Sequence, residues 1–208
     1  MKVLEFIVRF IYNSNAIEGN TLSLRDTNLI LQEGILPSDA NEREYKEVIN
    51  GREAMNFIKT YNGELNETLV LKTHSLLMSN IIKSAGEYRN HDVIIQGSEL
   101  KLPRFTEISI LMKRFFIWYN NNKRKLHPLE LAELVHTKFV RIHPFSDGNG
   151  RMSRLLMNFV LYKKRYPMFL IKNQERKEYY KALEKSDNGD DKIFINILFK
   201  NIVEQHSH

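Results

Sequence analysis

Apolar residues recur along most of the chain with the spacing of one face of an α-helix. In the first such segment, Val3, Phe6 and Ile7 stand at positions i, i+3 and i+4. Capping and turn residues bound the later segments, for example Ser23 at a start and Gly34 at an end. This pattern predicts helices over residues 3–13, 23–34, 41–61, 66–82, 105–121, 127–142, 149–164, 175–187 and 190–204. The predicted fold class is therefore all-α, a helical bundle.

One segment departs from the helical pattern. Residues 91–96 are rich in β-formers, Gly97-Ser98 is a tight-turn pair, and residues 99–102 alternate between polar and apolar. This predicts a short β-hairpin over residues 91–102. Because an isolated hairpin is only marginally stable, we expect it to pack against helices or to offer an edge to an extended peptide.

Composition narrows the class of protein. The chain has 208 residues, without internal repeats or linkers, which suits one domain with a core of its own. It has no cysteine, which excludes disulfides, thiolate metal sites and a thiol nucleophile. Neither a signal peptide nor an apolar run of membrane-spanning length is evident, so we expect a soluble, cytoplasmic protein with no membrane partner. The net charge of +6 comes from short cationic groups near acidic residues, which favours anionic ligands over nucleic acid.

The residues with the clearest chemistry are 143–154, HPFSDGNGRMSR, which form a loop leading into a helix. Gly148 and Gly150 let the backbone approach a ligand closely. The free amides at a helix N-terminus bind anions. Arg151 and Arg154 lie three residues apart, so both can reach one polyphosphate.

Two further side chains of this loop complete a site for phosphate transfer. His143 is suited to act as a general base near neutral pH. Asp147 is suited to hold Mg²⁺, which proteins usually bind through one or two carboxylates together with phosphate oxygens.

Residues 143–154 match the HPFx(D/E)GNGRxxR signature of the Fic family at each position, so the chain resembles that family. The resemblance implies a helical bundle with a β-hairpin flap, here near residues 91–102, in a single domain over residues 1–208 with its catalytic core at 66–204. It also implies an adenylyltransferase that moves AMP from ATP onto a Ser, Thr or Tyr hydroxyl of a target protein docked along the flap, with release of pyrophosphate.

The resemblance assigns a role to each polar residue of the motif. His143 deprotonates the target hydroxyl, and Asp147 holds Mg²⁺ between the α- and β-phosphates. Arg151 contacts the β-phosphate and Arg154 the γ-phosphate. The backbone amides of Gly148, Asn149 and Gly150 form the anion hole together with the Asn149 side chain.

A second motif, SNAIEG at residues 14–19, resembles the (S/T)xxxE(G/N) inhibitory helix of self-inhibited Fic proteins, with Ser14 and Glu18 in its defined positions. The resemblance implies that residues 1–20 form this helix. It also implies that Glu18 pairs with Arg154 and takes the place of the γ-phosphate.

A third region, residues 176–190, resembles the helix that closes the adenine pocket of the family. Tyr179 or Tyr180 would line that pocket or stack on the base. Asp187 stands where many relatives carry Asn, so the strictness of the ATP preference stays open.

Other functions remain compatible with the sequence. An enzyme of this fold could remove AMP, with Glu18 positioning water, or could transfer phosphocholine; Gly148 and Gly150 argue against the kinase branch. A nucleotide sensor without transferase activity is a further alternative, although it would not need His143.

The target protein and the oligomeric state stay open, a homodimer being one option. The remaining histidines are predicted to be structural or exposed, without a metal role for His136.

Overall fold

A computed structural model describes residues 3–37, 40–95, 100–187 and 192–206. Over these residues the chain is helical and contains no β-strand, which confirms the all-α class. The α-helices are α1 (Val3–Ile17), α2 (Leu24–Glu33), α3 (Glu42–Thr60), α4 (Glu67–Leu77), α5 (Ile108–Asn122), α6 (Pro128–Ile142), α7 (Asn149–Lys163), α8 (Arg176–Asp187) and α9 (Lys192–His206). Two short 3₁₀ turns, η1 (Phe105–Glu107) and η2 (Asn173–Glu175), precede α5 and α8.

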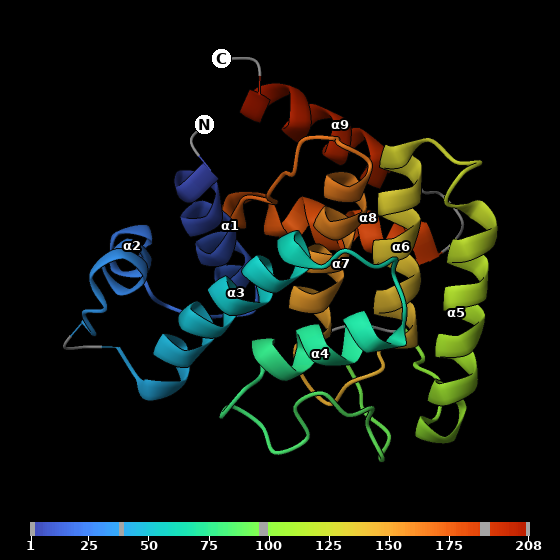
Figure 1. Ribbon diagram of the computed structural model, residues 1–208, viewed down its shortest axis with the longest axis horizontal. Coiled ribbons are helices and arrows are strands. Elements are labelled where there is room, and N and C mark those ends of the chain that lie inside the picture. The colour runs from blue at the N-terminus through green and yellow to red at the C-terminus, as the bar shows by residue number, and fades with distance from the viewer. Residues whose placement is uncertain (1–2, 38–39, 96–99, 188–191, 207–208) are drawn as a thin grey trace.

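Helix α7 lies at the centre of the bundle (Figure 1). It packs most extensively against α6, and α1, α3 and α4 also contact it. Almost every residue from Asn149 to Leu161 is buried, as expected for a helix surrounded by others. Helix α7, which begins beside Gly148 and Gly150, is therefore held by four neighbouring helices.

Helix boundaries follow the capping residues read from the sequence. Ser23 accepts a hydrogen bond from the Asp26 amide and donates its own amide to the Asp26 carboxylate, a complete capping box. Gly34 ends α2 in the left-handed region, with φ 68°. Helix α1 packs against α2, α3 and α7, so the chain's first helix lies beside its central one.

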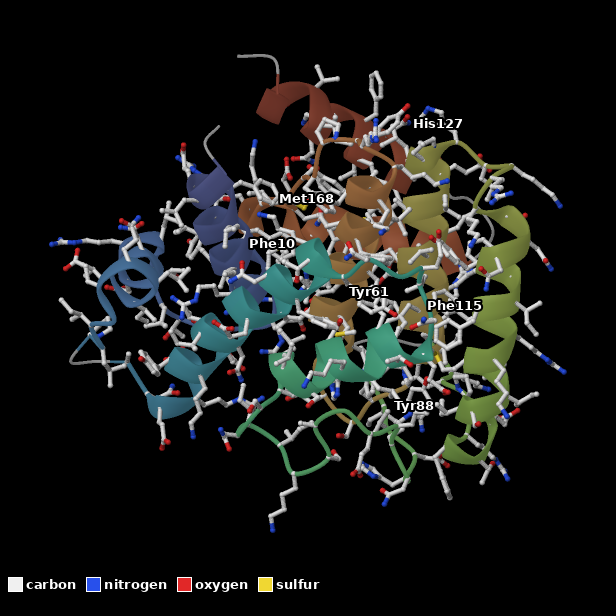
Figure 2. All side chains as sticks on the ribbon, viewed as in Figure 1. Phe10, Tyr61, Tyr88, Phe115, His127 and Met168 are labelled. Atoms are coloured by element: carbon white, nitrogen blue, oxygen red, sulfur yellow. The ribbon has the colours of Figure 1, made fainter. Side chains whose placement is uncertain are left out.

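The core is rich in aromatic side chains, and Figure 2 labels two of them, Phe10 and Phe115. Phe10 on α1 and Phe115 on α5 are both buried. Phe115 meets Phe139 of α6 edge to face, with ring centroids 6.2 Å apart. Phe139 in turn lies 6.2 Å from Phe145, in the loop between α6 and α7. These ring contacts pack the loop against the core.

The helix predicted over residues 66–82 is too long by one turn. It ends at Leu77, and both Ile81 and Ile82 donate their amides to the Met78 carbonyl instead. Asn80 lies in the left-handed region at φ 56°, which asparagine tolerates better than most residues. The apolar periodicity continues past Leu77 because Ile81 and Ile82 still pack against the core.

The β-hairpin predicted over residues 91–102 is not seen in its described parts, 91–95 and 100–102, which form no strand. Its proposed turn at Gly97-Ser98 lies outside the described residues. A two-stranded ribbon has little stability of its own. Side-chain hydrogen bonds from Arg89 hold the ends of the segment instead, to the carbonyls of His91 and Pro103.

None of the described helices is long and apolar enough to span a bilayer.

Candidate functional site

The loop between α6 and α7 begins and ends at residues whose backbone lies in the left-handed region. His143 ends α6 at φ 50° and ψ 58°, and its amide donates to the Phe139 carbonyl at 3.0 Å. Gly148 begins α7 at φ 77°, a conformation that favours glycine. A Cβ on Gly148 would also collide with the Met78 sulfur. The sharp turns bring His143 and the first amides of α7 to one end of the bundle.

The Asn149 side chain stabilises this loop through hydrogen bonds to its backbone. Its side chain donates to the Phe145 carbonyl at 2.8 Å and accepts from the Phe145 amide at 3.0 Å. The residue is only 2% exposed. Its side chain is therefore committed to the loop, and what Asn149 can offer an anion is its main-chain amide at the helix start.

His74 on α4 supports the same loop and was predicted only to be structural or exposed. Its Nδ1 accepts the Gly86 amide at 2.9 Å, so we place its proton on Nε2, which lies 3.1 Å from the Asp147 carbonyl. The ring stacks on Phe145 with centroids 3.6 Å apart. Burial lowers the pKa of His74 to about 4, so the ring stays neutral.

Asp147 is an ionised carboxylate at the mouth of the loop. Its Oδ1 accepts the Gly148 amide at 2.6 Å, and its Oδ2 pairs with Arg43 Nη2 at 2.6 Å. Arg151 approaches Oδ1 at 3.6 Å. Burial opposes ionisation, but Arg151, the Gly148 amide and Arg43 outweigh it and lower the pKa of Asp147 below its ordinary value.

Helix α3 contributes two charged residues that the sequence analysis did not identify. Arg43 pairs with Asp147, and Glu47 pairs with Arg151 Nη1 at 3.0 Å. Arg43 and Glu47 also contact each other, 3.2 Å apart. An Arg and a Glu four residues apart are typical of an exposed helix face, so nothing in the local pattern marks them as site residues. Glu47 nonetheless is buried, with 8% of its surface exposed.

Arg154 forms the predicted pair with Glu18. Its Nη2 lies 2.7 Å from Glu18 Oε1 and 2.8 Å from the Ser14 carbonyl, and its Nε lies 3.0 Å from Ser14 Oγ. Arg154 is 2% exposed. Burial disfavours its charge, but Glu18 outweighs that effect and raises the pKa of Arg154. Glu18 itself follows α1 in a turn, one residue beyond the helix end.

Glu18 also occupies the space at the start of α7. A Cβ on Gly150 would collide with Glu18 Oε1, so the carboxylate lies directly against the second residue of the helix. A helix N-terminus favours an anion at this position. Glu18 is thus the anion that the site holds in this structure.

These residues line one cavity of about 280 Å³. Residues from the α6–α7 loop, α7, α8 and the turn after α1 line its wall, namely His143, Gly150, Arg154, Tyr179, Tyr180 and Glu18. A larger open groove of about 700 Å³ lies between α1 and α2, but no residue of the predicted site lines it. The smaller cavity is therefore the candidate site.

The two tyrosines of α8 have different surroundings. Tyr179 is buried, with its hydroxyl 2.8 Å from His136 Nε2 and its ring 6.0 Å from the Arg154 guanidinium carbon. Tyr180 is partly exposed on the cavity wall, with its hydroxyl 3.4 Å from the Ile17 carbonyl. Both line the cavity, but Tyr180 is 38% exposed and Tyr179 only 1%. The side chain of Asp187 lies outside the described part of the structure.

The position and the lowered pKa of His143 suit its imidazole to accept a proton. Its Nδ1 lies 3.2 Å from the Val140 carbonyl, so we place the proton there and leave Nε2 free to accept. Burial lowers the pKa of His143, and the nearby Arg89 charge acts in the same direction. Glu18, Asp147 and the Val140 carbonyl oppose this shift without reversing it. The imidazole is therefore neutral at neutral pH.

The carboxylates near the site, those of Glu18, Glu47 and Asp147, do not form a cluster of metal ligands. Within the described ranges no group of three or more His, Cys, Asp or Glu side chains could hold a metal. Asp147 is the carboxylate that could bind Mg²⁺ together with phosphate oxygens and water.

Comparison with known proteins relates the chain to one family. Residues 64–161 match the model of the Fic/DOC family. A protein named "Protein adenylyltransferase Fic" from Aedes aegypti is 36% identical over 200 residues, which cover 93% of this chain and 40% of that protein. Its namesake from Nematostella vectensis is 34% identical, with 94% of this chain and 47% of that protein covered. The chain thus spans less than half the length of these curated relatives.

Two solved structures share the fold over almost the whole chain. A Fic domain containing signaling protein from Bacteroides thetaiotaomicron superposes with a TM-score of 0.89 at 31% identity, covering 96% of this chain and 84% of that one. Fic-1 from C. elegans also gives a TM-score of 0.89, at 29% identity, covering 99% of this chain and 62% of that one.

Proposed function

Because the chain belongs to the Fic/DOC family, we propose that it transfers AMP from ATP to a hydroxyl group of a target protein and that Glu18 restrains this activity. The observation that carries the proposal is the single cavity that His143 shares with Gly150 and Arg154. A proton acceptor, a helix N-terminus and a buried guanidinium are the groups that a phosphate-transfer site needs.

His143 begins the reaction by taking the proton of the target hydroxyl on its free Nε2. The hydroxyl oxygen then forms a bond to the α-phosphorus, and the bond from that phosphorus to the β-phosphate oxygen breaks. Pyrophosphate leaves, and AMP remains on the target. The amides of Asn149 and Gly150, at the N-terminus of α7, stabilise the negative charge on the phosphates, whereas the Gly148 amide donates to Asp147. Arg151 and Arg154 hold the β- and γ-phosphates.

Asp147 is the residue that would hold Mg²⁺. Its carboxylate is ionised and 39% exposed, and its partner Arg43 is 56% exposed and so free to move aside. When bound, the ion neutralises charge on the phosphates. These properties fit a single-carboxylate site of the kind that Mg²⁺ uses with nucleotides.

The adenine end of ATP would lie along α8. Tyr180 presents an accessible face to the cavity, whereas Tyr179 is buried and orients Arg154 through its hydroxyl, 3.5 Å from Arg154 Nη1. We therefore assign base stacking to Tyr180 and a supporting role to Tyr179. Asp187, at the end of α8, stays a candidate contact to the base.

The target protein would present its hydroxyl along residues 91–95 and 100–103. Ile95 and Leu100 from this segment line the cavity close to His143. We assign the catalytic core to residues 66–204 and the restraint to residues 1–20, in one domain.

The test of AMP transfer uses the position of a label on ATP. We would incubate the purified chain and its Glu18→Gly variant with Mg²⁺, a protein extract as acceptor, and ATP labelled on either the α- or the γ-phosphate. AMP transfer predicts protein labelling from α-labelled ATP and none from γ-labelled ATP. Labelling from the γ-phosphate alone would show phosphoryl transfer. Nucleotide binding without labelling from either position would favour a sensor.

The pH dependence of the rate follows from the lowered pKa of His143. We expect the rate of AMP transfer to stay constant as pH falls through about 6.5, the ordinary histidine value, and to decline only at lower pH. The Glu18→Gly variant should decline at still lower pH, because Glu18 is one of the charges that raise the pKa of His143. Initial rates between pH 5 and 8 provide the measurement. A decline that begins above the ordinary value would contradict a buried, neutral His143.

A further inference from the structure

One buried arginine joins three separate parts of the chain at the site. Arg89 Nε donates to the carbonyl of His143 at 2.8 Å, Nη1 to the carbonyl of His91 at 2.9 Å, and Nη2 to the carbonyl of Pro103 at 2.6 Å. The Arg89 amide also donates to the Pro144 carbonyl at 2.9 Å. The side chain is 0% exposed. The guanidinium thus connects the proton acceptor with both sides of the segment that we assign to target binding.

These contacts require an arginine rather than a positive charge alone. Guanidinium presents five donors in a planar fork, which suits three carbonyls at fixed positions. A lysine has a single compact ammonium group at the end of a flexible stem and cannot reach the same three acceptors in the same geometry. The nearest carboxylate, Asp92, lies 3.6 Å away and is exposed, so it contributes less than the carbonyl bonds.

The position of the His143 backbone matters because it is held in an unusual conformation. His143 has φ 50°, which places its ring at the cavity and its carbonyl toward Arg89. A displacement of about 1 Å at a reacting group can lower a rate by about 10²-fold. One side chain that bonds both the His143 carbonyl and the target-binding segment fixes the distance between the base and the hydroxyl it must deprotonate.

We propose that Arg89 is a positioning residue for AMP transfer: it sets the place of His143 relative to the target hydroxyl without contacting the nucleotide. This inference rests on the function proposed above. The hydrogen bonds and ion pairs of Arg89 go to residues 91, 92, 103, 143 and 144, and none goes to Gly150, Arg154 or Tyr180. Substitution of Arg89 should therefore slow the chemical step and leave nucleotide affinity unchanged.

The experiment measures these two quantities separately in the Glu18→Gly background. Initial rates of protein labelling from α-labelled ATP, across a range of ATP concentrations with Mg²⁺, give kcat and KM, and calorimetric titration gives the Kd for Mg²⁺-ATP. For Arg89→Lys we expect kcat to fall at least tenfold, with KM and Kd changed less than twofold. The matched control is Arg52→Lys, which makes the same change at an arginine of α3 that also donates to a carbonyl, that of Leu31 at 3.2 Å, and that does not line the cavity. Its kcat should stay within twofold of the parent.

The outcomes separate the inference from the function on which it rests. Absence of labelling in the Glu18→Gly parent would count against AMP transfer itself. Labelling in the parent together with an unchanged kcat in Arg89→Lys would overturn the positioning role. If Arg89→Lys does not fold, Arg89→Gln keeps a planar pair of N–H donors without the buried charge and allows the same comparison. Parallel losses of thermal stability, Kd and kcat in both variants would assign Arg89 to folding alone.

Discussion

Replacing Glu18 with glycine is expected to raise protein labelling from α-labelled ATP by about 10- to 100-fold. In the structure the Glu18 carboxylate lies 2.7 Å from Arg154 Nη2 and against Gly150 at the start of α7. It therefore takes both the guanidinium and the helix N-terminus that we assign to the phosphates. A hydrogen bond to a charged group contributes about 1.5–3 kcal/mol, which corresponds to this range of rates. Glu18 follows the end of α1, so a glycine there does not interrupt a helix.

The matched control is Glu33→Gly, which makes the same change at the last residue of α2. Glu33 is exposed and does not line the cavity, so its loss should leave labelling at the wild-type level. Glu18→Gln adds a second comparison, because it keeps the size of the side chain and removes the charge. Equal labelling in wild type and Glu18→Gly, with ATP still bound by both, would show that Glu18 does not restrain the reaction.

Replacing His143 with alanine in the Glu18→Gly background is expected to reduce labelling by about 10²- to 10⁴-fold, the usual contribution of a positioned general base. The buried, neutral imidazole with a free Nε2 is the one proton acceptor that we place beside the target hydroxyl. Its ring makes no contact that the phosphates need, so the Kd for Mg²⁺-ATP should change little. Label transfer and calorimetric titration on the same preparations test both statements.

His127→Ala is the matched control, since it makes the same substitution at the opposite end of α6. His127 caps that helix by accepting the Leu129 amide at 3.3 Å. Its loss should cost about 1 kcal/mol of stability without lowering the rate of labelling. A His143→Ala variant that labels as fast as its parent would require a different base.

Much of the architecture was predictable because caps and apolar periodicity act locally. The Ser23 capping box and the left-handed Gly34 lie where the sequence indicates them. The end of α4 was not predictable from the sequence. Ile81 and Ile82 pack against the core beyond the last residue of the helix, so the apolar pattern continues for one more turn than the helix does. Burial alone does not distinguish a helix from a compact turn packed on the same core.

The residues of the site likewise include some that the sequence predicted and some that it did not. The motif at 143–154 indicates the loop, and the resemblance anticipated the contact between Glu18 and Arg154 across most of the chain. Arg43, Glu47 and Arg89 were missed, because each acts through a partner far away in the sequence. Asn149 was expected to face an anion, yet its side chain binds the Phe145 backbone. A residue type fixes which bonds a side chain can make, and only the fold decides which partner it meets.

The order of Glu18 and Arg154 along the chain has a consequence during synthesis. Domains begin to form from the N-terminus as the ribosome extends the chain. Glu18 leaves the ribosome 136 residues ahead of Arg154, so the restraining carboxylate already exists when α7 first folds. Under the function proposed above, a nascent molecule in which residues 143–154 have just folded therefore already carries its inhibitory carboxylate. Newly made protein would then be inhibited from the start, without an interval of unregulated modification.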